Sequence, residues 1–376
     1  MKRFKMGNLA KMVAFFLIAT ALTCIAAFAA NGWQAQSDKP DSGKDQENSS
    51  NTNSDENQDG STQGGEGNPS DTEVIAPTPE YLHYITGTET TMEDYYSRPL
   101  CFTVGSSGPI YGISASFMTV EIPTECGETR MLCFMNKSAL PGKIGALSPT
   151  RDYISDIAGF FGGILFSVGC DDSFEYEHGS QNTVNIDFSK ISSYHYTEFN
   201  SYAYSNSDLI NAAVGNTGTD IHRDEAKTLP YKFLEYGDDF PALSGAASSV
   251  VISYKQSNTT GLYYSSELGA YVLYKNGSEV KDLISNKTVN YKNCFVLYAD
   301  ATTYETEGYT ETVLNTTKGG KGIYCTDGRY VNIRWSLDEN GELLFTNESG
   351  EKLTVNRGES YISFVKSSTG DDLTIS

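Results

Sequence analysis

A low-complexity tract near the N-terminus limits where this chain can fold. From Gln34 to about Pro77 the residues are almost all Ser, Asn, Asp, Gly, Gln and Glu, and almost no aliphatic or aromatic side chain occurs before Val74. Such a composition cannot bury enough apolar surface to offset the entropy of ordering the backbone. Its excess of acidic over basic residues favours an extended chain. Residues 34–78 are therefore predicted to be a disordered acidic linker, and the folded part is expected to begin near residue 79.

A basic and then apolar segment precedes this linker. Residues 1–11 carry basic side chains and no acid, and Met12 to Ala30 is an apolar run, which is typical of a secretory signal peptide or a membrane anchor. Ala27-Phe28-Ala29 fits signal-peptidase cleavage, whereas the uncleaved run is long enough to span a bilayer. Cys24 is a lipidation candidate in a loosely lipobox-like context; the alternative is a small apolar residue of a membrane segment. Residues 1–33 thus predict export to the extracellular face of the cell membrane or to the cell envelope, with the membrane as one partner.

Charge and motifs exclude several classes of function. The net charge of −21 argues against a nucleic-acid binder, because clustered Lys and Arg carry that affinity. No zinc-type Cys or Cys/His spacing occurs, so no metal site is predicted, and the cysteines after the signal form either disulfides or buried thiols. The GxSxG nucleophile elbow, the HExxH zinc-peptidase motif and the Walker loop are absent, and Gly320-Lys-Gly322 lacks the third glycine of a dinucleotide fingerprint. No cofactor is predicted.

Residues 79–240 mix strand and helix patterns. Leu100–Val104 predicts a short strand, and Phe117–Pro123 with Thr129–Met135 predicts a β-hairpin. If that hairpin is symmetric about Glu125 and Cys126, Glu121 lies opposite Arg130.

A helix and a further strand are expected next. Ser148-Pro149 predicts a helix start, with the serine as N-cap, and the apolar spacing from Tyr153 to Phe161 predicts its buried face. Gly162-Gly163 ends this helix, and Ile164–Val168 predicts another buried strand. The N-terminal domain, residues 79–240, is therefore expected to be mixed α/β.

From Ser248 onward the pattern is almost purely β. Apolar and aromatic runs alternate with turn pairs that suit positive φ, such as Asn276-Gly277 and Asp327-Gly328. The turn-rich segment 236–248 marks the boundary to a mainly antiparallel β C-terminal domain, residues 241–376, so the expected fold class is α+β. The 25 Tyr and 18 Phe would suit carbohydrate binding, although most stand in strand runs, where core packing is the commoner explanation.

Polar side chains gather at two places that could bind a ligand. In the predicted hairpin, Glu121, Glu125 and Glu128 beside Arg130 could share acid and base roles; we favour a Glu121–Arg130 ion pair with the other two facing water. At the predicted helix N-terminus, Arg151 and the free amide groups suit an anion. The alternative is that Asp152 answers the helix dipole and Arg151 pairs with a neighbouring acid. No catalytic residue is assigned, and the ligand-binding candidates are Glu121, Glu125, Arg130, Arg151 and Asp152.

Most of residues 85–366 resemble the YerB-like bacterial lipoproteins, which pair an N-terminal and a C-terminal domain of unknown function. The residues that carry this resemblance are Thr86-Gly87, Arg98-Pro99, Glu121 to Arg130, Lys143 to Tyr153, Gly320 to Trp335, Asn340-Gly341 and Gly358 to Val365. Ser148, a residue near Ser167 and Pro230-Tyr231-Lys232 depart from the family pattern, so a polar site built from those elements would be incomplete here. The resemblance implies a surface-tethered protein with two domains and brings no established reaction.

These patterns together predict an exported, surface-tethered envelope protein of unknown biochemical function that acts as a binding or scaffolding module. A cell-wall component or an envelope protein is the expected partner. The alternative is a cell-envelope hydrolase that uses the clustered Glu and Arg residues. An enzyme requires the hairpin carboxylates and the helix N-terminus to converge on one cleft, whereas a binding module requires only an exposed patch.

Overall fold

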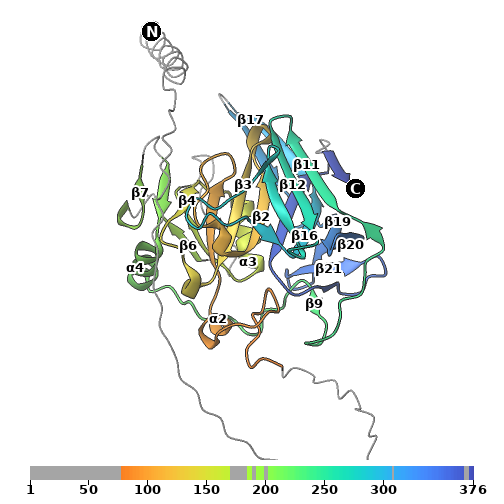
Figure 1. Cartoon of the computed structure of the whole chain (residues 1–376). Helices are drawn as coiled ribbons and strands as arrows, with labels where there is room; N and C mark the ends of the chain where they lie inside the picture. Colours follow the sequence, from red (N-terminus) through yellow and green to blue (C-terminus); the bar gives the residue numbers. More distant parts are fainter. Residues whose placement is uncertain (1–77, 170–183, 189–191, 199–201, 307–308, 368–371) are drawn as a thin grey trace, which may run out of the picture. The chain divides into compact units, whose positions relative to one another are not determined.

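The structure, a computed structural model, describes residues 78–169, 184–188, 192–198, 202–306, 309–367 and 372–376. Residues 72–376 form one compact unit, and its described part is mostly β (Figure 1). The predicted membrane segment, Cys24 and the linker up to residue 77 lie outside the described residues. Within the described part, no helix is both long and apolar enough to cross a membrane.

A large mixed sheet runs through this unit. Its strand order is β10-β20-β19-β16-β23-β2-β3-β1-β4-β8-β7, with β21 beside β20, β5 beside β1 and β6 beside β5. The strands are β1 (Leu100–Gly105), β2 (Ser116–Pro123), β3 (Thr129–Met135), β4 (Ile144–Leu147), β5 (Ile164–Ser167), β6 (Val184–Asp187), β7 (Tyr196–Thr197), β8 (Ala203–Ser205), β10 (Gly245–Ala246), β16 (Asn293–Ala299), β19 (Gly320–Thr326), β20 (Arg329–Leu337), β21 (Leu343–Asn347) and β23 (Ser360–Lys366). The predicted strands in both halves of the chain are thus confirmed.

Strand β23 joins the two halves of this sheet. It lies parallel to β16 on one side and to β2 on the other, so a strand from near the C-terminus pairs with one from residues 116–123. Its residues Ser360–Val365 are buried, as expected for a strand that is covered on both faces. The sheet therefore continues across the predicted domain boundary at residues 236–248.

A smaller antiparallel sheet covers one face of the large sheet (Figure 1). Its order is β14-β13-β12-β11-β24, with β15 beside β13. The strands are β11 (Ser249–Lys255), β12 (Asn258–Ser265), β13 (Ala270–Lys275), β14 (Ser278–Glu279), β15 (Asn290–Tyr291) and β24 (Asp372–Ile375). Apolar residues such as Val250, Leu262 and Leu273 pack with Met131 and Cys133 of β3 to form the first core. The predicted positive-φ turn residues Asn276, Gly277, Asp327 and Gly328 are confirmed.

The second core lies on the opposite face of the large sheet, against helix α3 (Asp152–Phe160). The predicted apolar face, Tyr153, Ile154, Ile157, Ala158 and Phe161, is buried as expected. The predicted start of this helix at Ser148-Pro149 is wrong. The amide of Ser148 donates to the Thr103 carbonyl and that of Thr150 to the Gly169 carbonyl, both at 2.9 Å, so this segment stays extended until Arg151.

Besides α3, several α-helices and strands lie outside these two sheets. They are helices α2 (Met92–Tyr96) and α4 (Ser207–Thr217), the pair β9 (Lys232–Phe233) with β22 (Thr354–Val355), and the hairpin β17 (Ala301–Thr306) with β18 (Tyr309–Leu314). The mainly β C-terminal region is confirmed. Residues 79–240 combine the helices with the parallel pairs β1–β5 and β5–β6, but strands predominate there too.

The predicted hairpin of β2 and β3 is present, but its register differs by one residue from the prediction. Glu121 lies opposite Met131, and Ile122 lies opposite Arg130. The turn is centred on Cys126, which adopts φ 54°, a left-handed conformation that is uncommon for residues other than glycine. A one-residue slip exchanges the faces of a strand, so Glu121 and Arg130 point to opposite sides of the sheet and the predicted ion pair does not form.

Burial of β23 generates a stability prediction. Phe364 is 2% exposed, and its ring contacts Trp335 edge-on at a centroid distance of 5.6 Å. We expect Phe364→Ala to lower the free energy of unfolding by about 3–5 kcal/mol, because it leaves a cavity beside Trp335 in the second core. The control Tyr304→Ala, at a side chain that is 52% exposed, should change it by less than about 0.5 kcal/mol. Denaturant titration measures both; equal losses would contradict the expectation.

Candidate functional site

Glu121 lies fully buried on the face of β2 that meets the smaller sheet. Its Oε1 accepts hydrogen bonds from Thr129 Oγ1 at 2.7 Å and from Lys275 Nζ at 2.5 Å. Its Oε2 accepts from Thr260 Oγ1 at 2.6 Å and from the Tyr361 hydroxyl at 2.8 Å. All four lone-pair positions of the carboxylate are therefore used inside the protein.

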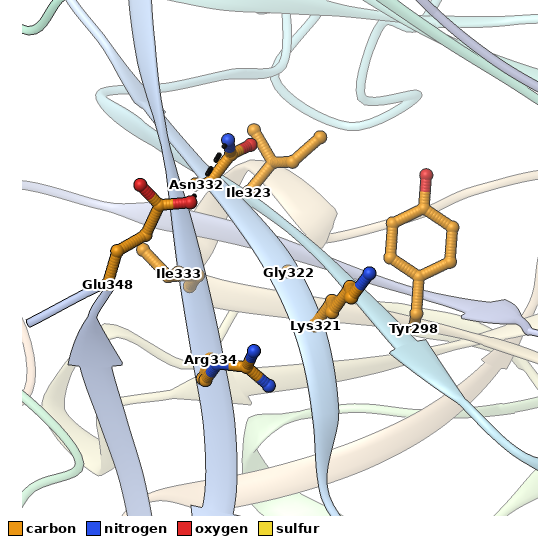
Figure 2. A pocket seen from close by; sticks show the side chains of 8 residues that line it. All are labelled: Tyr298, Lys321, Gly322, Ile323, Asn332, Ile333, Arg334 and Glu348. Atoms are coloured by element: carbon orange, nitrogen blue, oxygen red, sulfur yellow. Dashed lines mark hydrogen bonds between the residues drawn. The ribbon is translucent and has the colours of Figure 1, made fainter. Parts of the chain in front are cut away.

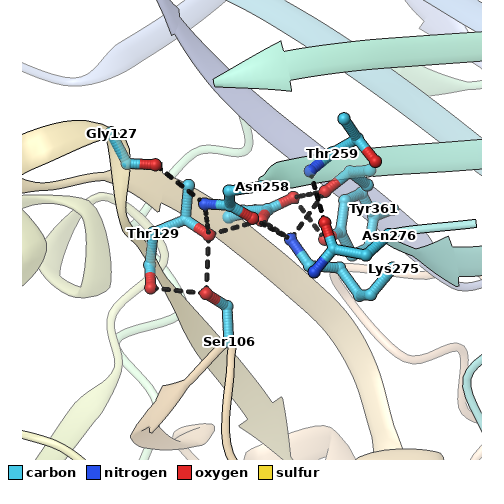
Figure 3. Close-up of polar contacts among 10 residues, drawn as sticks. Ser106, Gly127, Thr129, Asn258, Thr259, Lys275, Asn276 and Tyr361 are labelled. Carbon is cyan, nitrogen blue, oxygen red and sulfur yellow. Dashed lines mark hydrogen bonds and ion pairs between the residues drawn. The ribbon is translucent and has the colours of Figure 1, made fainter. Parts of the chain in front are cut away.

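Lys275, the partner of Glu121, is satisfied in the same way. Besides Glu121, its ammonium donates to Asn258 Oδ1 at 3.1 Å and to Thr260 Oγ1 at 2.8 Å, which uses all three of its protons. Asn258 in turn donates to the Gly127 carbonyl at 2.9 Å (Figure 3). The network ties the β2–β3 hairpin to β12, β13 and β23, and it leaves no group of Glu121 for a substrate.

The charge of Glu121 is stable in this setting. Burial alone would raise the pKa of Glu121, but the ammonium of Lys275 and the hydrogen bonds from Lys275, Thr260 and Thr129 hold that pKa below its ordinary value. Burial raises the pKa of the Tyr361 phenol well above its usual range, and the nearby Glu121 carboxylate adds to that rise. The tyrosine therefore stays neutral and remains a donor to the carboxylate.

The other predicted residues meet outside this network. Arg151, 1% exposed, donates to Glu125 through Nε at 3.1 Å and through Nη2 at 2.8 Å. Burial tends to raise the pKa of Glu125, yet the hydrogen bonds from Arg151 keep it below its ordinary value. Arg130 donates to the Pro149 carbonyl at 2.6 Å, and Asp152 is the first residue of α3. The structure thus brings Glu125 and Arg151 together, as the alternative pairing at the helix N-terminus predicts.

These placements separate the residues that a hydrolase would need. Glu121 is enclosed between the two sheets, whereas Glu125 forms a two-point ion pair with a buried arginine. In the described residues, no group of three or more His, Cys, Asp or Glu side chains is arranged to hold a metal ion. The carboxylates of Glu121 and Glu125 therefore form ion pairs within the protein.

An open groove lies instead on the large sheet, where strands β16, β19, β20 and β21 run side by side. We call it the β19–β20 groove; its volume is about 640 Å³. It is lined by Tyr298, Lys321, Gly322, Ile323, Asn332, Ile333, Arg334 and Glu348 (Figure 2). This volume is in the range of small-molecule sites in proteins.

The local sequence explains why β19 carries this groove. Alternate residues of a strand share a face, and on β19 that face passes from Cys325 in the first core to half-buried Ile323 and then to exposed Lys321. Lys321 stands between two glycines that pack closely on other strands. A Cβ at Gly320 would lie 2.1 Å from the Tyr298 carbonyl oxygen, and one at Gly322 would lie 2.9 Å from that of Val296. Gly320-Lys-Gly322 is therefore a strand segment that closes against β16 and presents Lys321 to solvent.

Two positive charges face each other in the groove. Lys321 pairs directly with Arg334 across the antiparallel strands β19 and β20. Neither side chain makes an ion pair or a hydrogen bond with any residue that the structure describes. Like charges directly opposite each other are destabilising, and this pair occurs on a chain of net charge −21. The arrangement suits an anionic group placed between the two side chains.

The other side chains that line the groove include both polar and apolar ones. Asn332 Nδ2 lies 3.5 Å from Glu348 Oε1, which leaves both side chains with unused hydrogen-bonding capacity. Tyr298 and Ile323 are half-buried and supply apolar surface. The groove can therefore bind a ligand that combines a negative charge, hydroxyl groups and an apolar face.

Comparison with known proteins places this groove inside a recognised domain. Residues 250–362 match a family described as protein of unknown function (DUF3048), C-terminal domain. The fold is similar to the crystal structure of YerB protein from Bacillus subtilis, with a TM-score of 0.67 and 20% sequence identity, over 79% of this chain and 100% of that chain. The resemblance to the YerB-like family is confirmed. No curated protein matches the chain.

The groove was missed by the sequence prediction, although the sequence held a signal for it. A two-residue turn at Asp327-Gly328 fixes the register of the flanking strands. Residues equally distant from that turn face each other, and this places Lys321 opposite Arg334. This like-charge pair lies within the region that matches the DUF3048 C-terminal domain. Recognised from the turn alone, it would have indicated an anion-binding surface.

The buried ion pair generates a prediction with a defined pH dependence. We expect Lys275→Met to destabilise the protein by about 3–5 kcal/mol at neutral pH, because Glu121 is left buried and unpaired. In the wild-type protein the pKa of Glu121 is lowered by folding, so its contribution is complete above the unfolded pKa and is lost as the pH falls through the folded pKa. In the variant, burial is no longer opposed by the lysine, and the pKa rises above the unfolded value. The variant should then regain relative stability on acidification.

Denaturant unfolding of both proteins between about pH 4 and pH 8 measures this difference, since that range spans the ordinary glutamate pKa. Lys281→Met, which removes a lysine whose side chain is 52% exposed, is the matched control and should follow the wild-type profile. A stability gap that stays constant over this range would show that Glu121 is not the titrating group.

Substitution of the buried Arg151 and of the exposed Lys321 should have different effects on the free energy of unfolding. We expect Arg151→Ala to cost about 3 kcal/mol or more, because it leaves Glu125 without its buried partner. Lys321→Ala should be neutral or stabilising by up to about 0.5 kcal/mol, because it removes a like-charge contact. Thermal and denaturant unfolding compare the two. A large loss in Lys321→Ala would mean that Lys321 has a structural role.

Proposed function

We propose that this chain is an exported, surface-tethered envelope protein and that it works as a binding module through the β19–β20 groove. The observation that carries this proposal is the direct Lys321–Arg334 pairing, in which two exposed cations lie opposite each other and neither forms an ion pair with a described residue. Such a pair lowers stability and is expected where a ligand supplies the missing charge.

The location rests on the N-terminal sequence. The basic start and the apolar run from Met12 to Ala30 support export and attachment to the membrane, either as an uncleaved anchor or through lipidation of Cys24. The acidic linker up to residue 78 would separate the folded unit from that membrane. A cell-wall component or another envelope protein is then the partner within reach.

We favour a binding role over hydrolysis because of where the carboxylates lie. Glu121 uses all its acceptor positions within the core, and Glu125 is tied to Arg151. A general acid or base must reach the substrate, and the side chain of Glu121 is enclosed.

The proposal keeps the two predicted domains. They are an α/β domain of residues 79–240 and a β domain of residues 241–376, and strand β23 joins them.

Sedimentation with isolated cell walls tests the proposal. The full chain, kept in mild detergent, is expected to co-sediment with walls of a Gram-positive-type bacterium. The double variant Lys321→Gln/Arg334→Gln should lose about a hundredfold or more in affinity, since each of the two charged contacts contributes about 1.5–3 kcal/mol. Lys281→Gln changes the same kind of charge between β14 and β15, away from the groove lining, and should bind as the wild type does. Equal retention of all three proteins would overturn the role of the groove, and membrane fractionation of cells would test the location separately.

A further inference from the structure

The β19–β20 groove also carries information about the chemistry of its ligand, and this step rests on the proposed function. We infer that the groove binds a glycan unit that bears a carboxylate or a phosphate. The inference uses four side chains with different chemistry that line one open surface: Lys321, Arg334, Asn332 and Glu348, with Tyr298 at the edge formed by β16.

The two cations in the groove indicate that the ligand carries a negative group. The Arg334 guanidinium can donate two parallel hydrogen bonds to a carboxylate or a phosphate, and Lys321 adds a second positive charge from the directly opposite position. An oxyanion between them would convert an unfavourable like-charge contact into two favourable ones. A neutral ligand would leave that repulsion unchanged.

The hydroxyl groups are assigned by the neighbouring amide and carboxylate. Asn332 both donates and accepts, and Glu348 only accepts, while the 3.5 Å contact between them is long for a hydrogen bond. Sugar hydroxyls donate and accept in turn, so adjacent hydroxyls can satisfy both side chains. An acidic peptide carries carboxylates but no row of adjacent hydroxyl donors for Glu348, which is why a glycan fits this surface better.

The ring of the sugar is assigned by the apolar surface. Tyr298 and Ile323 are half-buried, and their side chains supply apolar surface beside Lys321. The C–H face of a pyranose packs on such surface in the way that aromatic and aliphatic side chains pack on each other. Charge, hydroxyls and an apolar face thus occur together in one groove of about 640 Å³.

Calorimetric titration of the full chain in mild detergent tests the inference with five probes. Trigalacturonate and glucose 6-phosphate carry the charge on a sugar, as carboxylate and as phosphate respectively. Maltotriose is a neutral glycan, inorganic phosphate is an anion without a sugar, and tetraglutamate is an acidic peptide. We expect one of the two charged sugars to bind at least tenfold more tightly than the other three kinds of probe. The preferred one identifies the source of the charge.

Variants assign that binding to the groove. Arg334→Gln should weaken the charged sugar about tenfold and leave maltotriose unchanged, and Glu348→Gln should change the sugar affinity without abolishing the preference for charge. Lys281→Gln is the control and should have no effect. Because Lys321 and Arg334 are exposed, these variants are expected to fold, and thermal unfolding verifies that.

Each contrary result overturns a defined part. If maltotriose binds as tightly as the charged sugars, the negative charge has no role in recognition. If inorganic phosphate binds as tightly, the sugar has no role. If tetraglutamate binds more tightly, the groove is a peptide-binding site. If no probe binds while retention on cell walls still depends on Lys321 and Arg334, the ligand class is wrong and the groove remains the binding surface. If wall retention is also independent of both residues, the proposed function fails as well.

Discussion

The buried ion pair of Glu121 and Lys275 determines how the two halves of this chain fit together. The two residues are 154 positions apart, and Lys275 Nζ lies 2.5 Å from Glu121 Oε1 in the buried space between the two sheets. An isolated charge there would be very costly, so both side chains must be in place before either is favourable. Tyr361 on β23 and Thr260 on β12 complete the carboxylate shell. This network therefore joins the hairpin, the smaller sheet and β23 at one point.

That arrangement also decides where the sheet surface is left open. The smaller sheet covers the face of the large sheet that carries Glu121, and the cover extends along β19 as far as Cys325. Beyond it the same face emerges into solvent at Lys321. The groove thus begins where the core ends. A binding surface of this kind rests on strands that the core has already fixed, which keeps its side chains in position without a cost of ordering a loop.

The sequence predicts local structure well and distant contacts poorly. Strand alternation, the α3 apolar face and the Asn-Gly and Asp-Gly turns all depend on neighbouring residues, and each was found. The β2–β3 register failed because a five-residue loop and a four-residue loop fit the same pattern, and the left-handed conformation of Cys126 decides between them. The helix start failed because Ser148 and Thr150 donate to distant strands. The Glu121–Lys275 pair could not be predicted, since nothing in the spacing of either residue names the other.

A groove with low affinity for its ligand is sufficient for a protein that is held at its site of action. The linker from residue 34 to 78 would, as a flexible chain, have a root-mean-square span of roughly 40 Å, and its like charges would extend it further. With the chain attached at a membrane, as we propose, a wall polymer within that span meets the groove at an effective concentration in the millimolar range. Two cations and a few hydrogen bonds then suffice for occupancy. In the binding role that we propose, the repulsion between Lys321 and Arg334 would add selectivity, because only a ligand that carries negative charge relieves it.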